Sequence, residues 1–265
     1  MTGKNRSRWE PLHAGAERKL RIVEYVKQKH VATVSALAKE FQVHEATIRR
    51  DLAEIEQEGL LRRTHGGVIV DKGANVEPSF TERVSDQLEE KIRIGKKAAA
   101  LIEDGDHIIL DSGTTTMHIA QNLVHRSGIT VVTNDINVAA ELRDSPGINV
   151  IVTGGSLYKS SFMLNGMYTD HVLKTIHVQK AFIGTPAIHP KFGLTHPEAE
   201  LVPTKQWMIR AAQEIIVVTD HTKIGKVSLH TVAPVEEIHS FITGTEASEA
   251  QIQLFKDAGV HMITV

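Results

Sequence analysis

The chain contains no cysteine, which excludes disulfide bonds, thiolate nucleophiles and cysteine-ligated zinc. Its 15 histidines form no tight HxH or HExxH pair, so we expect neither a metal site nor another cofactor. No apolar stretch approaches the roughly 20 uncharged residues of a membrane helix, and the N-terminus lacks the apolar core of a signal peptide. These absences favour a cytoplasmic protein that does not contact a membrane.

What is present suits a globular protein of two domains: 265 residues, of which 41% are hydrophobic and 23% are charged. The net charge of −2 conceals an asymmetry, since residues 1–70 carry 13 Lys+Arg against 9 Asp+Glu, and the remainder carries 17 against 23. A basic N-terminal part on an acidic body indicates that the N-terminal part meets a polyanion.

The basic part divides into a polar, aperiodic arm over residues 1–16 and a domain over residues 17–72. The domain begins with a helix to about Lys29, followed by two short helices and a tight turn, which is the arrangement of a helix-turn-helix. The apolar positions of the three helices are Leu20, Ile22, Val23 and Val26, then Leu37, Ala38 and Phe41, then Ile48, Leu52 and Ile55. The stretch LLRRTHGGVIV after Gly59 predicts a β-hairpin that forms a basic wing.

The exposed face of the second short helix and the wing carry the predicted DNA contacts. Arg49 and Arg50 can reach phosphates or a guanine edge, and Thr47 can bond a phosphate. The full predicted set is His44, Glu45, Thr47, Arg49, Arg50, Arg62, Arg63, His65 and Gly66. For the arginine pair alone, the alternative is a solvated helix face with Asp51 and Glu54 as local partners.

The stretch VHEATIRRDLAEIEQEGLLRRTHGGV resembles the winged helix-turn-helix signature of the DeoR family of bacterial transcriptional regulators. The resemblance implies that this domain reads double-stranded operator DNA. One departure is His44, where the family usually has a serine that caps the helix. The departure concerns a capping bond worth typically ~1 kcal/mol rather than DNA binding itself.

Residues 73–90 are polar, include Pro78 and predict a linker, and residues 91–265 then predict an α/β domain. Short β-rich runs such as HIILD, ITVVT and EIIVVTD alternate with helical segments, among them one from about Pro197 to Ala212. This alternation predicts a Rossmann-like layered domain with a mostly parallel sheet.

Polar loops follow several of these strands, and ligands of such sheets bind beyond the carboxyl ends of the strands. A helix N-terminus with a glycine and several hydroxyl groups suits a phosphate. The effector contacts predicted on these loops are Asp111, Ser112, Gly113, Thr114, Thr115, Thr116, Thr133, Asn134, Gly154, Gly155, Gly184, Thr185, Asp220 and Lys223. Asp111 would repel a phosphate, so we expect it to organise its loop or to bind sugar hydroxyls. Each loop alone is as well explained by a cap or a turn; their repetition favours a shared anion pocket.

From about Pro78 to the C-terminus, the chain resembles the DeoR sensor domain, which is similar in fold to ribose-5-phosphate isomerase and generally binds a phosphorylated sugar or related metabolite. The matching motifs are DSGTTT from Asp111, TN from Thr133, TGG from Thr153, Gly166, FIG from Phe182, GLT from Gly193, Glu198 and DHTK from Asp220. The resemblance adds Glu198 to the predicted effector contacts. In FIGTPAI, Pro186 stands where the family commonly has an aspartate, and proline offers neither a carboxylate nor an N–H.

The two modules together predict a DNA-binding transcriptional regulator, expected to repress a carbohydrate-utilisation operon under the control of a phosphorylated sugar. A homo-oligomer, dimer or tetramer, is expected because one winged head reads few bases. One alternative is a sugar-phosphate isomerase with Glu198 as base and Lys223 as charge stabiliser. Because Glu198 also begins a helical stretch, where the helix dipole favours an acid, we expect no catalytic residue. Another alternative is a DNA-binding protein whose body serves only for oligomerisation.

Overall fold

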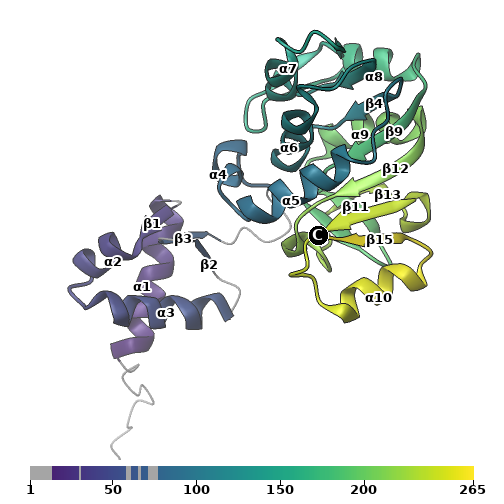
Figure 1. Cartoon of the computed structure of the whole chain (residues 1–265). Coiled ribbons are helices and arrows are strands. Elements are labelled where there is room, and N and C mark those ends of the chain that lie inside the picture. The colour runs from purple at the N-terminus through teal and green to yellow at the C-terminus, as the bar shows by residue number, and fades with distance from the viewer. Residues whose placement is uncertain (1–13, 30, 58–60, 65–66, 71–76) are drawn as a thin grey trace, which may run out of the picture. The chain divides into compact units, whose positions relative to one another are not determined.

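The computed structural model describes residues 14–29, 31–57, 61–64, 67–70 and 77–265. The chain divides into two compact units, Met1–Gly73 and Ala74–Val265 (Figure 1). Most of the expected arm, residues 1–16, lies outside the described residues, and the first helix begins at position 14. Over the described ranges, no helix has the length and apolar character needed to cross a membrane.

In the described part of the first unit, helices pack against a small antiparallel sheet. The helices are α1 (Ala14–Lys29), α2 (Val34–Glu40) and α3 (Glu45–Gln57), and the sheet order is β1 (Val31–Thr33), β3 (Gly67–Val70), β2 (Leu61–Thr64). β2 and β3 form the predicted hairpin. Ile48, Leu52 and Ile55 are buried in one core, as their spacing predicts.

Leu20 is 54% exposed, so its placement in the buried stripe of α1 was wrong. Ile22, which is fully buried, follows it by two residues. At 3.6 residues per turn, two positions apart lie on roughly opposite sides of a helix, so both cannot face the same core.

The start of α3 is capped by His44. Its carbonyl accepts the N–H of Ile48, and its ring Nδ1 accepts the N–H of Ala46, each at 3.3 Å. The ring nitrogen thus does what a serine hydroxyl usually does, because it satisfies one of the N–H groups that the first turn leaves without a helical partner. This bond requires an Nδ1 that carries no proton.

The second unit is built on a sheet whose seven strands are all parallel. In spatial order the strands are β15 (His261–Thr264), β14 (Ser240–Thr243), β12 (Ala212–Val218), β9 (Val178–Ile183), β4 (His107–Leu110), β5 (Ile129–Thr133) and β6 (Ile148–Val152). The chain runs outward from β4 to β6, returns to β9 beside β4, and runs outward again to β15. The winding therefore reverses between β4 and β9, which is where open α/β sheets bind ligands.

Helices cover both faces of this sheet (Figure 1). On one face lie α5 (Leu88–Ala99), α6 (Thr114–Leu123) and α7 (Ile136–Leu142), and on the other α8 (Met167–Lys174), α9 (Val202–Ala211) and α10 (Glu249–Asp257). Successive strand residues point to opposite faces, so Ile108 and Leu110 pack with α5–α7 while Ile109 packs with α8–α10. The sheet thus separates two apolar cores.

Several elements were not predicted. A hairpin joins β7 (Ser156–Tyr158) to β8 (Met163–Asn165), and a second antiparallel sheet joins β10 (Ala187–His189), β11 (Gly193–His196) and β13 (His230–Ala233). The segment expected to be a linker, residues 73–90, contains α4 (Phe80–Val84), begun by a Ser79–Glu82 capping box, and the start of α5. Short 3₁₀ turns also occur at His221–Lys223 and Val235–Glu237.

The helix expected from about Pro197 begins later. A 3₁₀ turn at Ala199–Leu201 comes first, and α9 follows with Pro203 in its first turn. Proline has no N–H to donate and fits only the first turn of an α-helix, so an α-helix from position 197 would have placed Pro203 in its interior.

Candidate functional site

Two of the predicted polar loops meet where the winding of the sheet reverses. Asp111 follows β4, and its Oδ2 accepts the N–H of Gly184, which follows β9, at 3.0 Å. Lys205 of α9 pairs with the same Asp111 oxygen and donates to the Gly184 carbonyl at 2.9 Å. The Lys205 and Asp111 side chains are 5% and 1% exposed. Asp111 and Lys205 therefore organise both loops from within.

Asp135, the N-cap of α7, holds the loop between β4 and α6. Its Oδ2 accepts the Ser112 hydroxyl at 2.9 Å and the Gly113 N–H at 3.2 Å, while its Oδ1 accepts the N–H of Asn137 at 2.7 Å. Burial raises the pKa of Asp135, and these hydrogen bonds offset only part of that effect. Two of the predicted effector contacts, Ser112 and Gly113, are thus engaged inside the protein.

The start of α6 offers donors that the helix itself does not use. The N–H groups of a first helical turn have no intrahelical acceptor, and here they belong to Thr114, Thr115 and Thr116, which follow the N-cap Gly113. All three threonine side chains are buried, and the Thr116 hydroxyl donates to the Gly113 carbonyl at 2.9 Å. Since the helix dipole also favours negative charge there, this turn is suited to bind an anion.

The loops after β5 and β6 hold neighbouring segments together. The Thr133 hydroxyl donates to the Leu110 carbonyl at 2.8 Å, and Asn134 Nδ2 donates to the Leu164 carbonyl at 3.0 Å. Gly155 has a φ of +121°, and a Cβ there would lie 2.5 Å from Thr169 Oγ1, so only glycine fits. The neighbouring Gly154 accepts a hydrogen bond from the same Thr169 hydroxyl.

The loop after β12 adds charge beside the β9 loop. The Thr219 hydroxyl donates to the Thr185 carbonyl at 3.3 Å, which ties the two loops together. Lys223 Nζ lies 4.0 Å from Asp220 Oδ2. Burial alone would raise the pKa of Asp220, but Lys223 and Thr222 outweigh it and lower the pKa. Lys91 of α5 feels the charges of both Asp220 and Lys223, and burial lowers its pKa to about 8.

Glu198 is connected to His196 of β11 and acts electrostatically on Tyr158 of β7. Its N–H donates to His196 Nδ1 at 3.0 Å, and its charge, after burial, contributes to raising the pKa of Tyr158 in β7. The hydrogen bonds recorded for the described residues connect Glu198 to His196 rather than to Asp111 or Gly184.

Lys205 and Asp135 were not among the predicted contacts. A signal for Lys205 exists in the sequence, because it stands four residues after Leu201 and three before Met208, both buried. A lysine on the buried face of a helix requires a buried partner, which here is Asp111.

One cluster has the composition of a metal site. Glu90, His221 and Glu246 bring one ligand atom each within 4.8 Å of one another. Their acceptors already have partners: Glu90 accepts the N–H groups of His221 and Gly244, and Glu246 is held by Arg93 at 2.6 Å. Hydrogen bonds and an ion pair thus account for the cluster without an ion.

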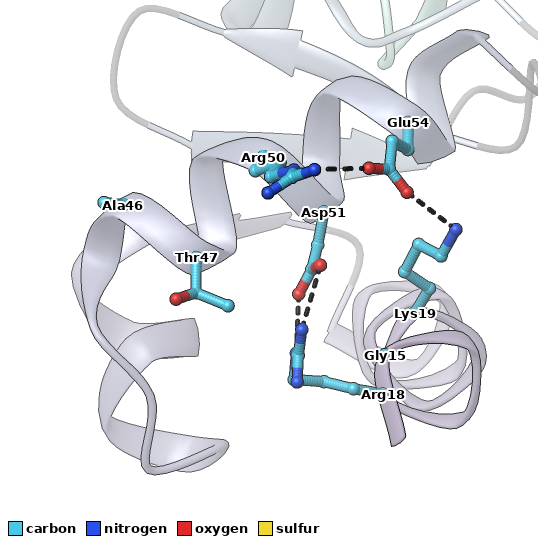
Figure 2. Close-up of a pocket in the computed structure, with 8 residues that line it drawn as sticks. All are labelled: Gly15, Arg18, Lys19, Ala46, Thr47, Arg50, Asp51 and Glu54. Atoms are coloured by element: carbon cyan, nitrogen blue, oxygen red, sulfur yellow. Dashed lines mark hydrogen bonds and ion pairs between the residues drawn. The ribbon is translucent and has the colours of Figure 1, made fainter. Parts of the chain in front are cut away.

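In the first unit, a groove of about 630 Å³ lies between α1 and α3, and Thr47 and Arg50 are among its lining residues (Figure 2). Arg18 pairs with Asp51 at 2.6 Å and Lys19 pairs with Glu54 at 2.8 Å, so these two pairs join the helices. The partner of Asp51 is therefore on α1 and not on its own helix.

The arginine pair of α3 is exposed. Arg50 is 84% exposed and lies 3.7 Å from Glu54, and Arg49 is 57% exposed and pairs with Glu45 at 2.7 Å. Both arginines have acidic neighbours on their own helix, yet both reach solvent. Arg62 and Arg63 belong to β2, whereas His65 and Gly66 lie outside the described residues.

Comparison with known proteins shows that both units match models of the DeoR family. Residues 86–245 match the model of the DeoR C-terminal sensor domain, and residues 18–74 match that of the DeoR-like helix-turn-helix domain. The HTH-type transcriptional regulator GolR of Listeria innocua is 32% identical over 244 residues, which are 92% of this chain and 96% of that protein. The HTH-type transcriptional repressor GlcR of Bacillus subtilis is 35% identical over 247 residues, 93% and 95% of the two chains.

Among solved structures, ribose 5-phosphate isomerase A of Methanocaldococcus jannaschii is similar to part of the chain. The likeness has a TM-score of 0.40 and 16% sequence identity, and covers 52% of this chain and 55% of that one. At that distance it has no bearing on activity.

Proposed function

Because the chain belongs to the DeoR family of transcriptional regulators, we propose that it represses a carbohydrate-utilisation operon under the control of a phosphorylated sugar. The observation that carries the sensing half is the first turn of α6, whose unused N–H groups begin three residues after Asp111, at the winding reversal of the sheet. The name of one relative, the repressor GlcR, supports the regulatory half.

In this proposal the phosphate binds at the N–H groups of Thr114, Thr115 and Thr116. Lys91 and Lys223 add positive charge near the neighbouring β12 loop. Ser112 and Gly113 shape the loop through Asp135 rather than by binding the phosphate. The sugar is bound and released unchanged, so neither a cofactor nor a catalytic residue takes part.

The DNA-binding half of the proposal rests on α3. Arg49 and Arg50 exchange their exposed acidic neighbours for phosphates or a base edge, which is feasible because exposed ion pairs contribute little free energy in water. Thr47 contributes a hydroxyl to the same face, and the hairpin of β2 and β3 forms the wing. A homo-oligomer places two such heads on paired half-sites.

Control works as a population shift in this scheme. The sugar phosphate binds one arrangement of the protein more tightly, and that arrangement binds the operator with a different affinity. By linkage, DNA must then change the affinity for the sugar phosphate by the same factor.

The test is a titration of the full-length protein with promoter DNA of the adjacent operon, followed by fluorescence anisotropy. It is repeated with a panel of hexose and pentose phosphates and with the unphosphorylated sugars. We expect one phosphorylated sugar to change the DNA affinity at least about 5-fold. A DNA affinity that no compound changes would refute the sensing half, and turnover of a bound sugar phosphate in a coupled assay would favour an isomerase.

A further inference from the structure

The buried pair of Lys205 and Asp111 has hydrogen-bonding capacity that the protein does not use. A lysine ammonium donates three hydrogen bonds, and Lys205 Nζ has two acceptors among the described residues, Asp111 Oδ2 and the Gly184 carbonyl. Asp111 Oδ2 receives two donors, whereas Asp111 Oδ1 is buried and has no partner in the described part of the chain. Within the described part of the chain, one donor of Lys205 and one acceptor of Asp111 therefore have no partner.

The unpaired Asp111 Oδ1 favours a ligand group that can donate a hydrogen bond to it. A buried carboxylate oxygen without a donor is unfavourable, and native proteins rarely leave one unmatched. Asp111 follows β4 and stands three residues before the start of α6, where the winding of the sheet reverses. A molecule bound through its phosphate at α6 would thus place its adjoining carbon atoms near Asp111.

The hydrogen-bonding capacity of Lys205 and Asp111 determines which kind of ligand group fits between them. A carbonyl or a phosphate oxygen accepts from Lys205 but cannot donate to Asp111 Oδ1, and a cation would be repelled by Lys205. A hydroxyl does both, since it has one O–H donor and two acceptor lone pairs. We propose that Lys205 and Asp111 together recognise one hydroxyl group of the phosphorylated sugar, and that this contact distinguishes it from sugars lacking that hydroxyl.

This inference rests on the proposed function, since it takes the phosphate to bind at α6. It goes further by naming the polar group next to the phosphate and the two residues that read it. Gly184 supports both partners, because its N–H and its carbonyl hold the Asp111 carboxylate and the Lys205 ammonium in place.

The first test uses the wild-type full chain, so no variant needs to fold. Isothermal titration measures the affinity for the tightest-binding hexose or pentose phosphate of the panel, for each of its monodeoxy analogues, and for inorganic phosphate. We expect removal of one particular hydroxyl to weaken binding roughly 100-fold or more, because its loss leaves buried polar groups unpaired. If every monodeoxy analogue binds within about 3-fold of the parent sugar, the inference is wrong.

The second test assigns that hydroxyl to the pair. D111N turns an acceptor into an amide of nearly the same shape, and D104N, at an exposed aspartate, is the matched control. We expect D111N to lose most of the preference for the parent sugar over the decisive deoxy analogue, while its affinity for inorganic phosphate does not fall, because the carboxylate that repels an anion is removed. An unchanged preference in a folded D111N protein would overturn the assignment.

The failures of the two proposals are distinguishable. If neither inorganic phosphate nor any phosphorylated sugar binds the wild-type protein, the proposed sensing function fails and this inference falls with it. If sugar phosphates bind and alter DNA affinity but no single hydroxyl matters, only the role of Lys205 and Asp111 fails. If D111N does not fold, the wild-type deoxy series alone still decides whether a hydroxyl is read.

Discussion

Glu77 Oε2 lies 3.2 Å from His196 Nε2, and Glu77 Oε1 lies 2.7 Å from Arg83, so the first described residue of the second unit is tied to β11 and α4. His196 Nδ1 accepts the Glu198 N–H, which leaves the ring proton on Nε2, where it faces Glu77. Burial alone would raise the pKa of Glu77, but Arg83 and His196 outweigh it and bring the pKa to about 2. Glu77 is therefore a strong anchor for the chain as it enters this unit.

We predict that E77Q weakens the sensor unit at neutral pH and flattens its response to acid. The folded-state pKa of about 2 lies below the unfolded value, so the stabilisation is complete above about pH 4.5 and is lost as the pH falls toward 2. The depressed pKa corresponds to about 3 kcal/mol at most. Urea denaturation of both proteins at pH 7, 4 and 3 measures the difference. E103Q, at an exposed position, should behave like wild type; a constant gap between E77Q and wild type at all three pH values would contradict the prediction.

A second prediction concerns Lys91, which is 3% exposed and donates to the Arg83 carbonyl at 2.6 Å. Burial lowers its pKa to about 8, so the folded state holds this proton less tightly than the unfolded state. The unfavourable burial of the charge is then fully present below pH 8 and is relieved as the pH rises through 8 toward 10.5, so stability rises over this window.

K91M removes that charge, and we expect it to be more stable than wild type at pH 7 and to lose the rise in stability attributable to Lys91. Denaturation at pH 7, 8.5 and 9.5 compares it with wild type, and K97M, at an exposed position on the same helix, serves as the control. A K91M protein that is clearly less stable at pH 7 would show that the Lys91 charge is favourable where it lies.

Local sequence patterns were enough to predict much of the fold, whereas contacts between distant segments determined the rest. The spacing of Ile48, Leu52 and Ile55 sufficed to predict the buried face of α3, because helical period alone determines which residues share a face. Pro203 marks the start of α9 in the sequence itself, because proline fits only the first turn of an α-helix. The hairpin of β7 and β8 carries no strong turn signal, so its pairing was missed.

The site was predictable only in outline. The position of the DSGTTT loop after a strand indicates an anion site from sequence alone, since strand, glycine and helix start are all local features. Which donors remain for a ligand depends on Asp135, a neighbour 22 residues from Gly113 that engages its N–H. The Lys205 and Asp111 pair spans 94 residues and could not be inferred from any local pattern.

A third prediction tests the anion site at α6. T115E places a carboxylate in the first turn, where it competes for the N–H groups that we assign to the phosphate and where the helix dipole tolerates it. We expect at least about a 10-fold loss of sugar-phosphate affinity, about 1.4 kcal/mol, and a repressor that no longer responds to the sugar. Calorimetric titration and DNA anisotropy with the full chain measure the two effects.

The matched control for T115E is T231E, the same exchange at an exposed position of β13. It should leave both sugar-phosphate affinity and DNA response unchanged. If T115E folds, binds DNA and still responds to the sugar like T231E, the phosphate does not bind at the start of α6.

The last prediction concerns α3. Arg50 is 84% exposed and shares Glu54 with Lys19, which holds the other carboxylate oxygen at 2.8 Å, so loss of Arg50 leaves the α1–α3 pair in place. We therefore expect R50A to fold normally and to bind operator DNA more weakly. If Arg50 contacts a phosphate, the slope of log affinity against log salt concentration falls by about 0.9; if it reads a guanine, about 1–3 kcal/mol of sequence discrimination is lost at one position instead. Anisotropy titrations at several salt concentrations with operator and scrambled DNA separate these cases. The control is R143A, because Arg143 belongs to the second unit and its side chain is 70% exposed. If R50A has the same DNA affinity, salt slope and sequence discrimination as R143A, Arg50 does not contact DNA.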